Sequence, residues 1–216
     1  MRWREPLDAV RVVRSALRDG WDALFVVGAL NLAWLGLSLT VVLLPPATVA
    51  LFESMDELAS GRAPGVRDFL GSVRRRFIGA WVWALWAVAG LTIVSVNVRY
   101  WNDTGGSLVW LSAAFAVLGV LFAMSLLYVW PFIFRQTEGG LLRAIRNSIL
   151  AVLAAPLFAI SLAILLVLVV AVSAILILPL AVFMTALVGL IATHAVTDRL
   201  RAFDKLPPRP SVEELE

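Results

Sequence analysis

Long uncharged stretches alternate with short charged segments along the chain. The four stretches without formal charge, with the single histidine taken as neutral, are residues 23–52, 77–98, 104–134 and 147–197. A helix needs about 20 predominantly apolar residues to cross a bilayer. The second stretch therefore predicts one span, the third predicts one span with a loop, and the fourth predicts two spans with Pro179 near the turn or in a kink. The first stretch is long for one span and short for two.

The arginines distinguish between these alternatives. All basic residues except Arg99 lie before the first stretch, between residues 62 and 76, between residues 135 and 146, or after residue 198. Cytoplasmic segments carry an excess of Lys and Arg, so we expect these four segments and both termini to be cytoplasmic. The first stretch must then enter and leave on one side, which predicts a helical hairpin turning around Thr40–Pro46. A five-span alternative places the N-terminus outside and is the second interpretation.

A weak internal repeat supports the hairpin. Segments 16–24, 72–80 and 144–152 align without gaps, and each follows an amphipathic lead-in with apolar residues at helical spacing. We expect each lead-in to lie on the cytoplasmic surface with its arginines among anionic lipid headgroups. The stripe of the first lead-in comprises Leu7, Val10, Val13, Leu17 and Trp21. The same pattern is also expected at any cytoplasmic helix entry, which is the alternative to a true triplication.

Composition indicates the same class of protein. Hydrophobic residues make up 61% and charged residues 15% of the 216 residues, against about 45–50% and 25% in soluble domains. We therefore predict an all-α, polytopic integral membrane helical bundle of three helical hairpins, with six membrane helices (five as the alternative) and cytoplasmic amphipathic lead-in helices. A single transmembrane domain would cover residues 1–206, with modules at about 6–60, 63–138 and 140–200. Residues 207–216 would form a flexible cytoplasmic tail.

Few side chains are candidates for chemistry. The chain has no cysteine, which excludes a disulfide framework and a thiol nucleophile, and it carries no phosphate-binding loop, HExxH or GxSxG motif. We expect no enzyme activity, cofactor or metal. His194 lies four residues before Asp198, a spacing that can tune a proton but more often indicates an interfacial, hydrogen-bonded histidine. Asn31, the most central polar residue of the first stretch, predicts an inter-helix hydrogen bond or a substrate contact.

Two charged groups flank the end of the first predicted module. Pro46 is expected to open the return helix of the first hairpin, where its missing N–H costs little. The acidic group that ends this helix comprises Glu53, Asp56 and Glu57. The basic group that opens the next module comprises Arg74, Arg75 and Arg76. We expect an ion-pair network between the groups; alternatively, the arginines anchor lipid phosphates and the acids are functional.

Several short motifs carry a family resemblance. They are Asn31-Leu-Ala-Trp-Leu-Gly-Leu-Ser-Leu39, Leu44-Pro-Pro-Ala-Thr-Val-Ala-Leu-Phe52, Gly61-Arg-Ala-Pro64, Arg67-Asp-Phe-Leu70 and Arg74-Arg-Arg-Phe77. This region resembles the YesL-like bacterial membrane proteins of unknown function (DUF624). Thr40 stands where the family often has proline and Pro45 where it often has glycine. The resemblance implies a bacterial plasma-membrane protein, often encoded near carbohydrate uptake or degradation genes, and it carries over no catalytic residue.

The sequence leaves three functions open. The leading hypothesis is a non-enzymatic accessory or regulatory component for carbohydrate or solute uptake, whose partners are the bilayer and a permease or other membrane protein. A small transporter is the alternative, and a membrane-embedded enzyme is third. Nucleic acid is not expected as a partner, because the arginines fall in short clusters between apolar runs.

Overall fold

All regular elements of the described residues are helical. The computed structural model describes residues 5–136, 140–175 and 179–202. In chain order, its elements are α1 (Glu5–Asp22), α2 (Leu24–Ser38), α3 (Leu44–Ala59), α4 (Val66–Thr104), the 3₁₀ turn η1 (Gly106–Leu108), α5 (Trp110–Arg135), α6 (Gly140–Ala154), α7 (Pro156–Ile175) and α8 (Pro179–Ala202). The all-α prediction is confirmed over these ranges, and the predicted tail at 207–216 lies outside them.

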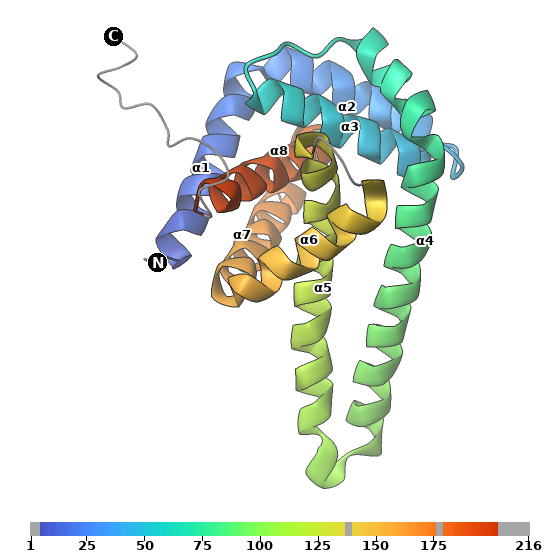
Figure 1. Cartoon of the computed structure of the whole chain (residues 1–216), viewed down its shortest axis with the longest axis vertical. Coiled ribbons are helices and arrows are strands. Elements are labelled where there is room, and N and C mark those ends of the chain that lie inside the picture. Colours follow the sequence, from blue (N-terminus) through green and yellow to red (C-terminus); the bar gives the residue numbers. More distant parts are fainter. Residues whose placement is uncertain (1–4, 137–139, 176–178, 203–216) are drawn as a thin grey trace.

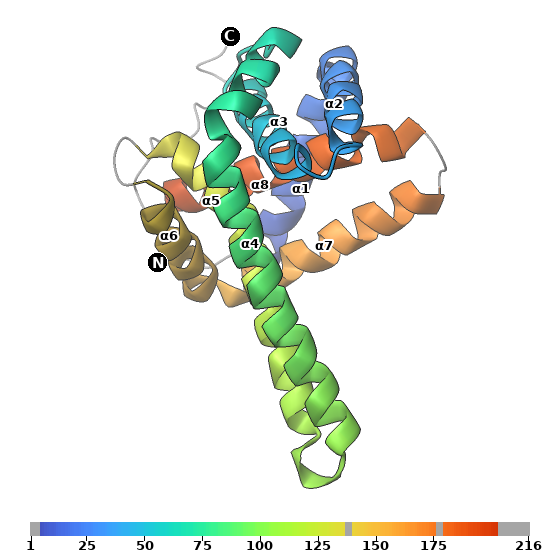
Figure 2. The same ribbon diagram turned by 90° about the vertical axis from the view of Figure 1, so that its right-hand side faces the viewer.

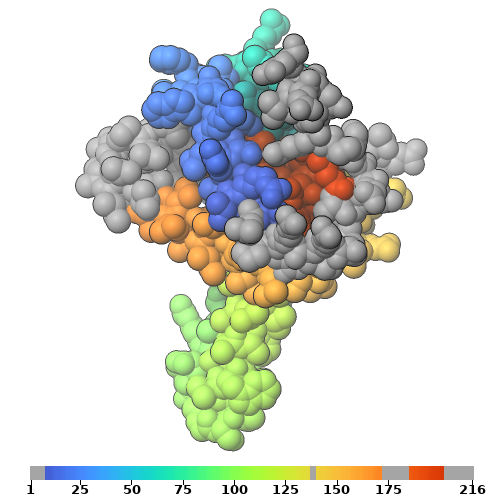
Figure 3. All heavy atoms as spheres, turned by 90° about the vertical axis from the view of Figure 1, so that its left-hand side faces the viewer, coloured from blue at the N-terminus to red at the C-terminus, as the bar shows by residue number. Residues whose placement is uncertain are grey.

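The helices form a wide head from which one long hairpin projects (Figure 1). The hairpin consists of α4 and α5, which run antiparallel, and its far half leaves the head (Figure 2). The space-filling view in Figure 3 shows this narrow part below the head. With 39 residues, α4 is about 58 Å long at 1.5 Å per residue. The remaining helices gather around the near halves of α4 and α5.

Two segments are long and apolar enough to cross a membrane. They are α4 and the unit Gly106–Arg135, and only 6% of the apolar window of each is buried. The second and third uncharged stretches therefore form one long helical segment each, as the sequence predicts. Two further pairs pass the same test together but are sharply bent, by 91° between α1 and α2 and by 98° between α6 and α7. The structure thus contains two to four candidate spans within its described residues.

Small residues bring α4 and α5 close together. A Cβ atom at Gly90 would lie 2.2 Å from Phe122 Cζ, and one at Gly119 would lie 2.7 Å from Val94 Cγ1. The Phe122 ring also packs edge-on against Trp86, with the ring centroids 4.9 Å apart. Glycines permit such close backbone approach between apolar helices. The hairpin is therefore held by interlocking side chains along its length.

The last helix forms the centre of the head. Residues Leu190, Ile191, Ala195 and Val196 of α8 are buried, and α8 packs against α1, α2, α3 and α5. Helix α8 begins at Pro179, which agrees with the predicted position of the turn or kink in the fourth stretch. Proline favours the first turn of a helix because its missing N–H is not needed there.

The first predicted lead-in forms α1, and most of its described apolar stripe is exposed on the protein, at Val10, Leu17 and Trp21. The opposite, buried face comprises Ala9, Val12, Val13 and Ala16, and α1 packs against α7 and α8. The small alanines allow close packing on this face, and the exposed stripe stays open to the membrane surface on which the lead-in is predicted to lie. The second lead-in is continuous with α4 and the third forms α6.

The first uncharged stretch forms two short helices joined by a tight turn. Helix α2 ends at Ser38 and α3 begins at Leu44, with prolines in its first turn. This places Pro46 at the start of the return helix, as the sequence predicts. Trp34 Nε1 donates to Thr48 Oγ1 at 3.1 Å and links α2 to α3.

The close contact at Gly90 predicts a position-specific cost of added volume. We expect Gly90→Ala to destabilise the detergent-solubilised protein by about 1–3 kcal/mol, because the Phe122 ring must move. Gly36→Ala in α2 is the control, since a Cβ there meets no atom within 4 Å. The measurement is thermal unfolding. Phe122→Leu should partly restore the stability of Gly90→Ala, and equal stability of the two glycine variants would contradict the packing.

Candidate functional site

A cluster of ion pairs joins the end of α3 to α4. Glu53 accepts hydrogen bonds from Arg75 Nη2 at 3.2 Å and from Arg76 Nη2 at 3.2 Å. It also accepts a short hydrogen bond from Ser72 Oγ. Residues three and four apart share one helix face, which is why these α4 groups reach one carboxylate. The predicted ion pairs are confirmed for Arg75 and Arg76, and Arg74 forms no ion pair within the described residues.

Asp56 extends this cluster to α5. Both Nε and Nη2 of Arg135 donate to Asp56 Oδ1, at 3.1 and 2.9 Å. The side chain of Asp56 is only 10% exposed and that of Arg135 only 19%. Arg135 is the last residue of α5, and the guanidinium of Arg76 lies 5.7 Å from the ring centroid of its neighbour Phe134. Three helices are therefore tied together at one place.

We call this set the boundary cluster. It comprises Glu53, Asp56, Ser72, Arg75, Arg76 and Arg135. Glu53 directly follows the first uncharged stretch, Arg76 directly precedes the second, and Arg135 directly follows the third. The cluster thus aligns one end of each of the first three uncharged stretches at a common level. Arg135, the partner of Asp56, is not among the arginines that the sequence predicts to pair with the acidic group.

Burial and charge act differently on the two carboxyl groups, which lie outside the two unbent candidate spans. Burial raises the pKa of Glu53, but the hydrogen bonds from Arg76 and Ser72 and the nearby guanidinium charges outweigh burial, so this pKa lies below its ordinary value. Burial raises the pKa of Asp56 above its ordinary value, although Arg135 counteracts the rise. Glu53 is therefore the better-stabilised carboxylate of the two.

A hollow of about 320 Å³ lies beside Glu53. Its walls come from α3 and α4 and comprise Glu53, Ser54, Glu57, Arg67, Asp68, Gly71, Ser72 and Arg75. Charges of both signs line it, which suits water or a zwitterionic group better than a net anion. Nowhere in the described part of the chain do three His, Asp or Glu side chains gather as potential metal ligands.

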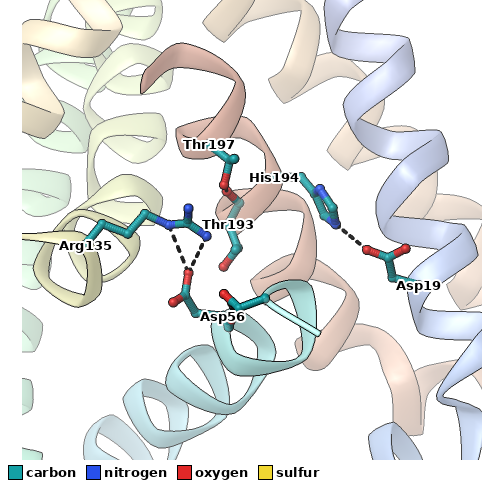
Figure 4. A network of polar contacts seen from close by, with 7 residues as sticks. Asp19, Asp56, Arg135, Thr193, His194 and Thr197 are labelled. Atoms are coloured by element: carbon teal, nitrogen blue, oxygen red, sulfur yellow. Dashed lines mark hydrogen bonds and ion pairs between the residues drawn. The ribbon is translucent and has the colours of Figure 1, made fainter. Parts of the chain in front are cut away.

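A second polar contact lies on the other side of α8 (Figure 4). His194 Nε2 lies 2.7 Å from Asp19 Oδ2 of α1. The hydrogen bond expected for His194 is therefore present, and its partner is a carboxylate of α1, which packs alongside α8. Asp198, four residues further along α8, pairs with Arg199 at 2.6 Å.

Arg199 is a buried charge that the sequence analysis did not single out. Its side chain is 5% exposed and lies over the Phe158 ring, with Cζ 3.9 Å from the ring centroid. Asp198 and, at 3.7 Å, Asp8 of α1 supply the negative charge. This arrangement compensates the positive charge of Arg199 inside the head.

Asn31 and Pro46 lie apart from these charges. Asn31 is 1% exposed, and its Nδ2 donates to Val27 O of the same helix at 3.1 Å. No group of the described residues donates to its Oδ1, so the expected inter-helix hydrogen bond is not found there. Pro46 is buried in the first turn of α3. Because it has no N–H, it cannot donate to a carbonyl of the preceding turn.

The described helices define an all-α protein with at least two segments long and apolar enough to span a membrane. Residues 27–98 match the family described as protein of unknown function, DUF624. The match confirms the family resemblance drawn from the sequence motifs. It covers α2, α3 and most of α4, and so includes Glu53 with all its partners. Searches of curated proteins and of solved structures found no match.

The boundary cluster predicts a pair-specific charge rescue. Glu53→Arg should destabilise the solubilised protein, because it places a third positive charge beside Arg75 and Arg76. We expect Arg76→Glu, and to a smaller extent Arg75→Glu, to restore part of the loss in a double-mutant cycle on thermal stability. Arg74→Glu is the matched control and should restore nothing. Additive losses for all three arginines would show that Glu53 is not coupled to them.

The two pKa shifts predict opposite pH effects. The contribution of Glu53 is complete above its ordinary pKa and is lost as the pH falls through its lower folded-state pKa. For Asp56 the raised pKa means that stability is lost as the pH rises towards that value. Between about pH 3 and pH 7, we expect Glu53→Gln to reduce the loss of unfolding free energy that occurs as the pH falls. We expect Asp56→Asn to remove the loss of unfolding free energy that occurs as the pH rises. Unfolding free energies across this range test both, and parallel curves for the two variants would contradict the shifts.

Proposed function

We propose that this chain is a multi-pass bacterial plasma-membrane protein that acts as a non-enzymatic accessory or regulatory component of carbohydrate or solute uptake. The candidate spans and the charge distribution support the multi-pass membrane placement, and the link to uptake rests on what the family resemblance implies about neighbouring genes. Both termini would be cytoplasmic, and the boundary cluster would lie at the cytoplasmic face. Arginines at that face would contact anionic lipid headgroups.

The boundary cluster and the hairpin loop support the placement of the bilayer. The uncharged part of α4, residues 77–98, is 22 residues long, or about 33 Å. That length matches a hydrocarbon core of about 30 Å. Arg76 stands at one end of this segment and Arg99 at the other. The hairpin would therefore cross the bilayer once in each direction, with its loop outside.

A polar stripe on the outer half of α4 supports the proposal that the chain binds a protein partner. Thr92, Ser95 and Arg99 are exposed at helical spacing, and they line a shallow groove of about 380 Å³ with Val88, Leu91 and Val96. Hydroxyl groups on membrane helices commonly hydrogen-bond to neighbouring helices. The groove thus fits a transmembrane helix of another protein, and the guanidinium at its outer end favours a partner carrying a carboxylate.

Transport by the chain alone is the alternative function. Two observations on α8 favour it: the His194–Asp19 contact with α1 and, on the side of α8 that faces Asp56, a buried Thr193 hydroxyl that no described group engages (Figure 4). A transporter would bind solute in the absence of a partner. A solute-dependent rise in the melting temperature of the purified chain would therefore favour transport over the accessory role.

Site-specific photocrosslinking in cells tests the accessory role. We expect a photoreactive residue at Thr92 or Ser95 to form one adduct of defined mass with an integral membrane protein of an uptake system. Ile93 is the control, because it is 63% exposed but lies on a different face of α4. Lipid adducts alone at all three positions would contradict a partner at this groove, as would the same protein adducts from all three.

A further inference from the structure

The α2–α3 hairpin is too short to cross a bilayer. Its helices have 15 and 16 residues, which corresponds to about 22–24 Å each, against a hydrocarbon core of about 30 Å. The uncharged part of the hairpin, residues 23–52, is bounded by Asp22 and by Glu53, which lies inside α3. Glu53 lies in the boundary cluster, at the level where the uncharged part of α4 begins. The hairpin crosses α4 obliquely (Figure 1), with its tip beside Trp81, and therefore reaches only part of the way through the membrane.

The tip of this hairpin exposes apolar side chains and no charge. Leu39, Val41 and Val42 are 82%, 75% and 58% exposed. Trp81 of α4, which lies in the uncharged segment just beyond Arg76, contacts the tip directly. The exposed surface of the tip is therefore continuous with the exposed apolar surface of a candidate span. Side chains of this kind are matched by lipid acyl chains.

Two prolines leave carbonyl groups of the tip without their usual donors. In a helix, the carbonyl of residue 41 or 42 would accept the N–H of residue 45 or 46, but Pro45 and Pro46 have no N–H. The Val41 carbonyl accepts instead from Leu44 N, at a long 3.4 Å. The Val42 carbonyl accepts from the indole Nε1 of Trp81, at 3.1 Å. The indole therefore supplies the donor that Pro46 lacks.

The neighbouring carbonyls complete this pattern. Thr40 O accepts from Leu43 N at 3.0 Å and Leu43 O accepts from Ala47 N at 2.9 Å. All four carbonyls from residue 40 to residue 43 thus have a donor from the protein itself. Water would supply such donors at an exposed turn, whereas hydrocarbon supplies none, so a turn in lipid must satisfy its backbone internally.

We propose that α2 and α3 form a re-entrant hairpin whose tip, residues 39–43, inserts into the acyl chains of the leaflet next to the boundary cluster. Trp81 supplies the donor for the Val42 carbonyl and fixes the tip against α4. The occupant of the exposed tip surface is lipid hydrocarbon, and the tip emerges on neither side of the membrane. This insertion is independent of whether the protein acts as an accessory component or as a transporter.

Cysteine accessibility tests the insertion, since the native chain has no cysteine. Single cysteines are placed at Val41, at Ser60 beyond the end of α3 and at Thr104 in the hairpin loop. An impermeant maleimide is applied to intact cells, to inverted vesicles and to detergent-solubilised protein. We expect Val41→Cys to lose its labelling in both membrane samples and to regain it in detergent. Leu39→Cys provides a second tip position if Val41→Cys fails to accumulate.

The controls define the outcomes that overturn the proposal. Ser60→Cys should react only in inverted vesicles and Thr104→Cys in intact cells. Labelling of Val41→Cys in intact cells would mean that the tip crosses the membrane. Labelling as fast as that of Ser60→Cys in inverted vesicles would mean that the tip lies in water. Either result overturns the insertion and leaves the proposed partner groove on α4 untouched.

A proline–tryptophan cycle tests the role of the indole. Trp81→Phe keeps an aromatic ring but removes the donor, so we expect a lower melting temperature in lipid nanodiscs. Pro46→Ala restores a backbone N–H opposite the Val42 carbonyl and should recover part of that loss in the double variant. Trp110→Phe is the control, because this exposed tryptophan lies at the far end of the long α4–α5 hairpin, away from the tip of the α2–α3 hairpin. A loss for Trp81→Phe no larger than the control, or no recovery with Pro46→Ala, would contradict the proposed backbone role.

Discussion

The contact between Glu53 and the arginines of α4 sets the level of the other elements. A charge cannot enter hydrocarbon cheaply, so the carboxylate that ends one uncharged segment and the guanidinium that begins the next belong at the same depth. Their direct pairing, at 3.2 Å for Arg76, holds α3 and α4 in register. The Asp56–Arg135 pair then adds α5 to this register. The long hairpin and the short α2–α3 hairpin are thereby aligned at their charged ends, whatever their lengths.

Local features of the fold were largely predictable from the sequence. Proline positions and uncharged runs mark helix starts through steric and solvation effects that act within a few residues, as at Pro46 and Pro179. The family resemblance followed from the same local motifs. The ion pair between the acidic and basic groups was also accessible, because Glu53 and Arg76 are separated by 23 residues with turn-forming glycines and a proline between them.

The long-range contacts were not predictable in this way. Asp56 and Arg135 are 79 residues apart, and no local rule selects this arginine over others near the same face. The buried side of α1 depends on which helix packs against it, and small residues such as Ala9 and Ala16 carry little hydrophobic signal. The sharp bend between α1 and α2 is likewise not marked by a proline, and both helices pack against α8, which is far away in the sequence.

The position of α8 has a consequence for the order of folding. This helix lies at the centre of the head but is made after the other described helices, and its contact with α1 joins residues 175 positions apart. Domains form progressively during synthesis, from the N-terminal side, but here α1, α2 and α3 have no completed core to pack on until translation of α8 is finished. The long hairpin, held by neighbouring contacts, can form much earlier, since local contacts close quickly. Assembly of the head therefore waits for α8, and a chain truncated before α8 would leave the apolar faces of α1 and α3 uncovered and open to aggregation or proteolysis.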